Sequence, residues 1–160
     1  MKTSAAPVTL RPLVDSDRAA VEAMTRAAGV FREDEIPVAL EVFQATAAGN
    51  DTYEGLAADR DGRVAGWISW GPTPCTLGTY DLYWIVVDSS CQGEGIGTLL
   101  LQAMERALAG RGRLIVVETA GRTEYAPTRA FYEKHGYTAT ARIPDFYEPG
   151  DDQVTYIKSI

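Results

Sequence analysis

Cysteine and histidine are scarce in this chain of 160 residues. It contains two cysteines, Cys75 and Cys91, and one histidine, His135. Two cysteines are too few for a disulfide framework, and the three residues lack the spacing of metal ligands. We therefore expect no disulfide scaffold and no metal site. The low cysteine content favours a reducing cytoplasm as the compartment.

Positive charge and long apolar runs are lacking as well. The 15 Lys and Arg are outnumbered by 22 Asp and Glu, and the net charge is −7. Because nucleic acids and anionic membranes are bound through basic surfaces, we expect neither as a partner. No apolar run approaches the roughly 18 residues of a membrane span, and the N-terminus has no apolar signal core. With 46% apolar residues, we expect one domain over residues 1–160, with residues 1–7 as a loose end.

The centre of the predicted fold is a strand, a glycine-rich turn and a helix. Residues 82–87 are apolar, aromatic and β-branched, as expected of a buried strand, and residues 98–108 have a helical pattern. Between them stands Gln92-Gly93-Glu94-Gly95-Ile96-Gly97. Glycines let backbone amides approach a ligand, and a helix N-terminus adds unpaired donors and a positive dipole end. Such a turn can hold a phosphate group.

Other glycine motifs fit this turn less well. The dinucleotide-binding fingerprint is G-x-G-x-x-G/A, and counting from Gly93 puts Thr98 where the third small residue belongs. The fingerprint also requires an acidic residue about twenty positions on, which Glu118 supplies, so this alternative stays open. A Walker A loop requires a lysine that is missing here. An ordinary strand-to-helix turn is a further alternative for these six residues alone.

The rest of the pattern predicts the element order β-α-α-β-β-β-α-β-α-β-β. Strands are expected at residues 8–11, 52–70 (two, joined at Asp61-Gly62), 79–87, 114–118, 137–143 and 153–157, and helices at 15–28, 37–48, 98–108 and 127–135. The strand–helix–strand around the glycine turn should be a right-handed parallel crossover, which would place Glu118 near Gln92 at the ligand-binding edge.

Two segments resemble one superfamily. Gln92, Gly95 and Gly97 match Gln/Arg-x-x-Gly-x-Gly/Ala, the acyl-CoA motif of the GNAT N-acyltransferases, and residues 131–137 are similar to the F/L-Y-x-x-x-G-F/Y segment of the same superfamily. Together they cover residues 81–137. The resemblance implies the GNAT fold, an α/β (α+β) fold with a mixed sheet of six or seven strands and a splayed strand pair around acyl-CoA. It also implies an N-acetyltransferase that uses acetyl-CoA as co-substrate.

The resemblance also implies the acyl-CoA site. Amides of the turn would hold the diphosphate, and amides freed at a splay or β-bulge of the preceding strand would contact the acetyl carbonyl. Many relatives have an Asn that holds the pantetheine arm seven residues before the motif tyrosine, and this chain has Tyr125 at that position. Compared with the family pattern, residues 119–124 are extra. The expected acyl-CoA-binding residues are Ile85, Val86, Val87, Gln92, Gly93, Glu94, Gly95, Ile96, Gly97, Thr98 and Tyr125.

The catalytic candidates are Tyr132, Glu118 and Asp81. Tyr132 corresponds to the general acid of the family, and a Tyr with a pKa of ~10 stays protonated at neutral pH. Glu118 and Asp81 are candidate bases because burial beside apolar strands could raise the pKa of either carboxyl group. The alternative for both is a strand-end carboxylate bonded to backbone amides. We expect no catalytic role for His135, beside a helix C-terminus, or for Cys91, which lacks a nearby His.

The predicted acceptor is a primary amine of a small molecule, an amino acid or amine, which attacks the thioester directly. A peptide or protein N-terminus is the alternative, as is a non-catalytic module that binds acyl-CoA or a dinucleotide. Loop acids could attract an amine cation or be simply solvated. The segment 31–35 is interpreted either as a solvated connector or as one wall of the acceptor pocket. A homodimer is a further candidate assembly.

Overall fold

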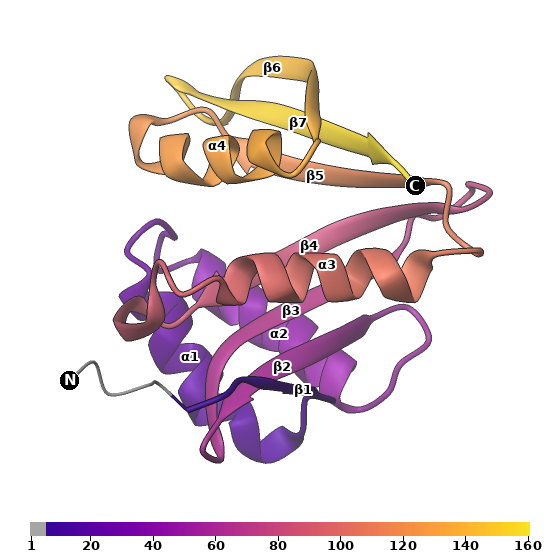
Figure 1. The fold of residues 1–160 in the computed structure, drawn as a ribbon. Helices are drawn as coiled ribbons and strands as arrows, with labels where there is room; N and C mark the ends of the chain where they lie inside the picture. The colour runs from indigo at the N-terminus through magenta and orange to yellow at the C-terminus, as the bar shows by residue number, and fades with distance from the viewer. Residues whose placement is uncertain (1–5) are drawn as a thin grey trace. The chain divides into compact units, whose positions relative to one another are not determined.

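The computed structural model describes residues 6–160. Of the predicted loose end at residues 1–7, positions 1–5 lie outside the described residues. The predicted element order is confirmed (Figure 1). The strands are β1 (Thr9–Arg11), β2 (Glu54–Arg60), β3 (Arg63–Pro72), β4 (Thr79–Val87), β5 (Leu114–Ala120), β6 (Thr138–Glu148) and β7 (Asp151–Ser159). The helices are α1 (Arg18–Ala27), α2 (Glu35–Ala47), α3 (Ile96–Leu108) and α4 (Ala126–Lys134).

The strands form a seven-stranded mixed sheet in the order β1-β2-β3-β4-β5-β7-β6, which confirms the predicted fold class. The chain divides into two compact units. The first unit holds residues 1–71 and 84–107, and the second holds residues 72–83 and 108–160. A single domain over residues 1–160 remains a prediction.

The first unit is built on the antiparallel strands β1, β2 and β3. Asp61 and Gly62, both with positive φ (55° and 77°), make the predicted two-residue turn between β2 and β3. Trp67 of β3 is fully buried among apolar residues of α1 and α2, and its indole nitrogen donates to the Thr25 hydroxyl at 3.3 Å. These helices therefore cover the Trp67 face of β3.

Helix α3 packs on the other face of β3, at Gly66. A Cβ at this glycine would lie 3.0 Å from Ile96 Cγ2 and 3.1 Å from Leu100 Cδ1, both on α3. Neighbouring residues of a strand point to opposite faces. Gly66 therefore faces α3, and Trp67 faces α1 and α2. The absence of a side chain at Gly66 lets the helix that follows the glycine turn approach the sheet closely.

The second unit contains the predicted parallel pair. The first half of β4 pairs with β5 from Thr79↔Leu114 to Leu82↔Val117, and β5 pairs antiparallel with β7. Helix α4 contributes its buried Tyr132, whose ring contacts those of Tyr137 and Tyr156. The predicted parallel pairing of β4 and β5 is confirmed, and Glu118 follows its last paired residue in β5.

Several predicted boundaries were wrong. Helix α3 begins at Ile96 and not at residue 98, and β5 runs on to Ala120, so two residues of the supposed insertion belong to a strand. Strand β6 continues past Pro144 because an irregular register between Ile143 and Glu148 accommodates it. The first helix was predicted from residue 15, but α1 begins at Arg18; the Asp17 carboxylate just before it accepts bonds from Arg11 and from the Val14 amide.

Candidate active site

The glycine turn follows β4 and leads into α3. Its conformation explains the glycines, because Gly93 and Gly95 have φ values of 78° and 82°, which L side chains rarely adopt. No atom lies within 4 Å of a Cβ built at either position. The two glycines are thus required by backbone shape, and the space around them is open.

The start of α3 directs backbone donors toward this turn. The first helical bond runs from the Leu99 amide to the Gly95 carbonyl at 3.0 Å, so the amides of Ile96 and Gly97 precede the hydrogen-bond ladder of the helix. They lie at the positive end of the helix dipole. Gln92 anchors the turn to the strand through a bond from its side-chain amide to the Val87 carbonyl at 3.4 Å. This arrangement can receive a phosphate group.

The end of β4 presents amides to both of its edges. The Asp88 amide donates to the Ala65 carbonyl of β3 at 2.9 Å. Because successive amides of a strand point to opposite edges, those of Val87 and Ile85 point away from β3, and that of Val86 points toward it. The Val86 side chain is buried in the core. Within the predicted set, Ile85 and Val87 are therefore better placed than Val86 to offer an amide to a ligand.

Asp81 and Glu118 lie on the same face of the second unit's sheet. Asp81 pairs in register with Val116, two residues before Glu118, and alternate residues share a face. The parallel register of β4 and β5 ends at Leu82 and Val117, one residue before Glu118. Partial desolvation, followed by the negative charge of Asp81, raises the pKa of Glu118. The Asp81 carboxylate accepts a bond from the Thr73 hydroxyl at 2.8 Å.

Tyr132 is held by a cluster of aromatic rings. Its side chain is only 3% exposed, and its ring centroid lies 5.4 Å from Phe131, 5.6 Å from Tyr137 and 6.2 Å from Tyr156. Among residues 6–160 its hydroxyl has no hydrogen-bond partner. Burial, with a smaller contribution from Tyr125, raises the pKa of Tyr132. The phenol is therefore a fixed, protonated donor at neutral pH.

Tyr125 ends the short 3-10 turn Thr123–Tyr125 that precedes α4. The Arg122 guanidinium lies 4.9 Å from its ring centroid and forms an ion pair at 2.8 Å with Asp151, which is 2% exposed. Arg129 donates to the carbonyls of Ala120 and Arg122. The loop that carries Tyr125 is thus anchored to β7 through Asp151 and to α4 through Arg129, and neither anchor was predicted from the sequence.

Three acids near the C-terminus, Asp145, Asp151 and Asp152, have partners within the second unit. Besides the buried Asp151, Asp152 pairs with Arg142 at 2.6 Å, and the Asp145 carboxylate accepts the Gly150 amide at 2.7 Å. His135 bonds through Nδ1 to the Phe131 carbonyl at 2.7 Å, beside the end of α4.

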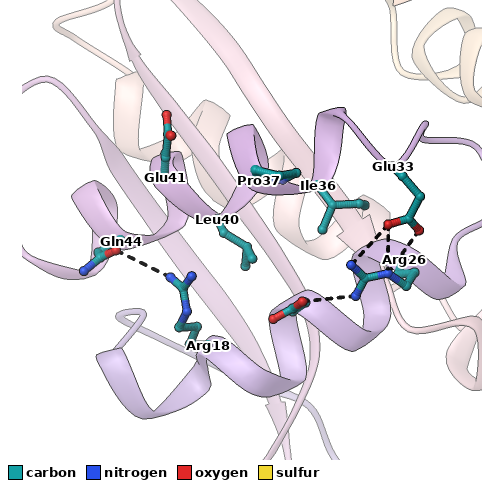
Figure 2. Close-up of a pocket in the computed structure, with 9 residues that line it drawn as sticks. Arg18, Arg26, Glu33, Ile36, Pro37, Leu40, Glu41 and Gln44 are labelled. Atoms are coloured by element: carbon teal, nitrogen blue, oxygen red, sulfur yellow. Dashed lines mark hydrogen bonds and ion pairs between the residues drawn. The ribbon is translucent and has the colours of Figure 1, made fainter.

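A groove of about 390 Å³ lies between α1 and α2 (Figure 2). Arg26 of α1 pairs with Glu22 of the same helix and with Glu33, which precedes α2, both at 3.1 Å. Arg18 of α1 donates to Gln44 of α2 at 3.5 Å. The segment 31–35 contributes Glu33 to this groove. Most of the charged side chains that line the groove pair with one another, and their contacts link α1 to α2 and to the segment before it. We therefore assign no function to this groove.

Within the part of the chain that the structure describes, no group of three or more His, Cys, Asp or Glu side chains is arranged to hold a metal ion. In the same residues, no helix is both long and apolar enough to cross a membrane.

Comparisons with known proteins place the chain in a family. Residues 51–139 match the acetyltransferase (GNAT) domain model. A GNAT-family protein from Desulfovibrio desulfuricans is 37% identical with a TM-score of 0.89, over 96% of this chain and 99% of that chain. An uncharacterized N-acetyltransferase from Methanocaldococcus jannaschii is 31% identical over 63% of each chain. An aminoglycoside 6'-N-acetyltransferase in complex with coenzyme A shares the fold, with a TM-score of 0.75 at 18% identity over 94% of this chain and 96% of that chain. The chain therefore belongs to the GNAT family of acyl-CoA-dependent N-acetyltransferases.

Proposed function

We propose that this protein transfers the acetyl group of acetyl-CoA to a primary amine of a small molecule. The observation that carries the proposal is the turn at Gly93 and Gly95, two glycines with positive φ values. This turn leads directly into the N-terminus of α3, where the first backbone amides have no partner within the helix. The fold-level neighbour in complex with coenzyme A supports acetyl-CoA as the co-substrate. The two free cysteines of the structure are compatible with a cytoplasmic reaction.

In the proposed reaction the neutral amine attacks the thioester carbonyl without a covalent enzyme intermediate. A C–N bond forms, the C–S bond breaks, and the products are an amide and CoA. The amides of Val87 and Ile85 stabilise the developing oxyanion. Glu118 accepts the proton that the amine loses, directly or through water, and Tyr132 donates a proton to the departing sulfur. The amides from Gly93 to Thr98, together with Gln92 and Tyr125, hold the diphosphate and the pantetheine arm.

A small acceptor is favoured by the compact loops. Strands β6 and β7 are joined through only Pro149 and Gly150, the latter with a φ of 87°. Asp81 and Glu118 supply the negative charge that an amine cation requires, whereas the C-terminal acids are paired with residues of their own unit. A peptide N-terminus remains the second candidate acceptor, and the homodimer stays a prediction.

Calorimetry and an acceptor screen test this proposal. Wild-type protein should bind acetyl-CoA in the micromolar range and should release CoA, detected as free thiol, when one amine of a library is added. The library should contain amino acids, simple amines and peptides, so that the result also decides between the two acceptor classes. No binding of acetyl-CoA or CoA at millimolar concentration would contradict the proposal, and tight binding of NAD would support the dinucleotide alternative.

Glu118 predicts a particular pH dependence. A base acts in its deprotonated form, so kcat/KM should rise with pH through the pKa of Glu118, which lies above the ordinary value for a glutamate. Asp81→Asn should shift this rise in kcat/KM, the acidic limb of the pH profile, to lower pH, because it removes the negative charge that helps to raise the pKa of Glu118. Glu118→Gln should abolish the limb and lower kcat/KM about 10²-fold. An unchanged profile in Glu118→Gln, measured with the same acceptor, would assign the base to another group.

A further inference from the structure

Arg60, the last residue of β2, reaches the glycine turn from more than thirty residues away in sequence. Its Nη2 forms an ion pair with Glu94, and its Nη1 lies 3.7 Å from the Cys91 sulfur. The Arg60 side chain is 19% exposed, and its Nε is buried without a partner among the described residues. Both terminal nitrogens of the guanidinium are thus directed at the segment from Cys91 to Glu94.

Glu94 presents an electrostatic problem at this position. It stands between Gly93 and Gly95 and places a carboxylate in the turn that the proposed function assigns to a diphosphate. The whole chain already carries a net charge of −7. Like charges that lie close together at a protein surface repel each other. An unpaired Glu94 would therefore oppose the binding of a polyanion.

We infer that Arg60 is a positioning residue of the acyl-CoA site, which neutralises Glu94 and holds it away from the bound diphosphate. The inference rests on the proposed function, because it requires acetyl-CoA to bind at this turn. The ion pair draws the Glu94 carboxylate toward the end of β2, while the amides of the turn stay available. Arg60 then acts on the affinity for the diphosphate and leaves the chemical step unchanged.

The chain offers a matched control for this idea. Arg63 begins β3 and pairs in register with Arg60 across the hairpin, but its side chain is exposed. Arg63→Ala removes the same charge from the same hairpin without removing the ion pair to Glu94. A general effect of protein charge on a polyanionic ligand would appear in both variants, whereas loss of the Glu94 pair would appear in Arg60→Ala alone.

The decisive comparison is a double-variant cycle with CoA as the calorimetric probe. We expect Arg60→Ala to raise the Kd of CoA about tenfold or more and Arg63→Ala to change it by less than about threefold, whereas Glu94→Gln, which removes the carboxylate that Arg60 neutralises, should not raise it. The double variant Arg60→Ala/Glu94→Gln should recover to within about threefold of wild type, because no carboxylate is left to repel the ligand. Where Arg60→Ala does not fold, Arg60→Gln gives the same cycle with a long polar side chain retained.

Kinetics with acetyl-pantetheine, which lacks the diphosphate, separate positioning from a general structural role. Arg60→Ala should raise the KM for acetyl-CoA but leave kcat and the KM for acetyl-pantetheine within about twofold of wild type. Equal losses with both thioesters would overturn the inference, as would equal losses in the single and double variants. Wild-type protein that binds no CoA would instead overturn the proposed function, so the two failures are distinguishable.

Discussion

Tyr132→Phe is expected to lower kcat about 10²-fold while the Kd of acetyl-CoA changes by less than about threefold. The substitution removes the phenol that donates a proton in the transition state, but it keeps the ring that packs against Tyr137 and Tyr156. Because the Tyr132 hydroxyl has no hydrogen-bond partner among the described residues, its loss leaves no buried group unpaired. We expect the lower part of the range typical of general acids, since a thiolate with a pKa near ~8.5 leaves tolerably well without a proton.

Tyr156→Phe is the matched control for this prediction. Tyr156 belongs to the same aromatic cluster, but its hydroxyl donates to the Glu133 carboxylate at 2.9 Å. Its loss should cost about 1 kcal/mol in the free energy of unfolding and leave kcat nearly unchanged. If folded Tyr132→Phe turns over within about twofold of wild type at saturating acceptor, the proton comes from water or another residue. The next hydroxyls to replace would be that of Tyr125, which ends the 3-10 turn before α4, and that of Tyr147, which lies in β6 and not in a loop as expected from the sequence.

Gly55→Ala is expected to lower the free energy of unfolding by about 3 kcal/mol. A Cβ at this position in β2 would lie 2.7 Å from Thr46 Cγ2 and would also collide with the Ile68 backbone carbonyl of β3. A backbone atom cannot move aside as a side chain can. The contact also lies beside the buried hydrogen bond between the Thr46 and Ser69 hydroxyls, at 2.8 Å, which joins α2 to β3. Denaturant unfolding, followed by the fluorescence of the buried tryptophans, measures the loss.

Gly49→Ala separates this clash from the general cost of replacing a glycine. Gly49 has a φ of 73°, and no atom lies within 4 Å of its built Cβ. Replacement there should cost only about 1–2 kcal/mol, the strain of a left-handed backbone. If Gly55→Ala and Gly49→Ala lower the free energy of unfolding equally, the packing of α2 on β2 and β3 relaxes around the methyl group added at position 55.

The sequence alone determined the element order and the two motifs, because both are encoded locally. Strand and helix periodicities repeat within a few residues, so the β-α-α-β-β-β-α-β-α-β-β order followed from them. The Asp61-Gly62 turn was predicted correctly because a two-residue hairpin turn requires positive φ values that few residues adopt. Tyr132 was singled out by its motif, and the structure adds the aromatic cluster that surrounds it.

Only the tertiary structure decided which distant residues meet. Arg60 and Glu94 carry no local signal of their pairing, and the loop acid Asp151 became a buried partner of Arg122 through the register of the second unit. The raised pKa of Glu118 depends on partial desolvation and on Asp81 of the adjacent strand. Charges and desolvation act through space, so the electrostatics of this site depend on strand pairing that no local pattern in the chain specifies.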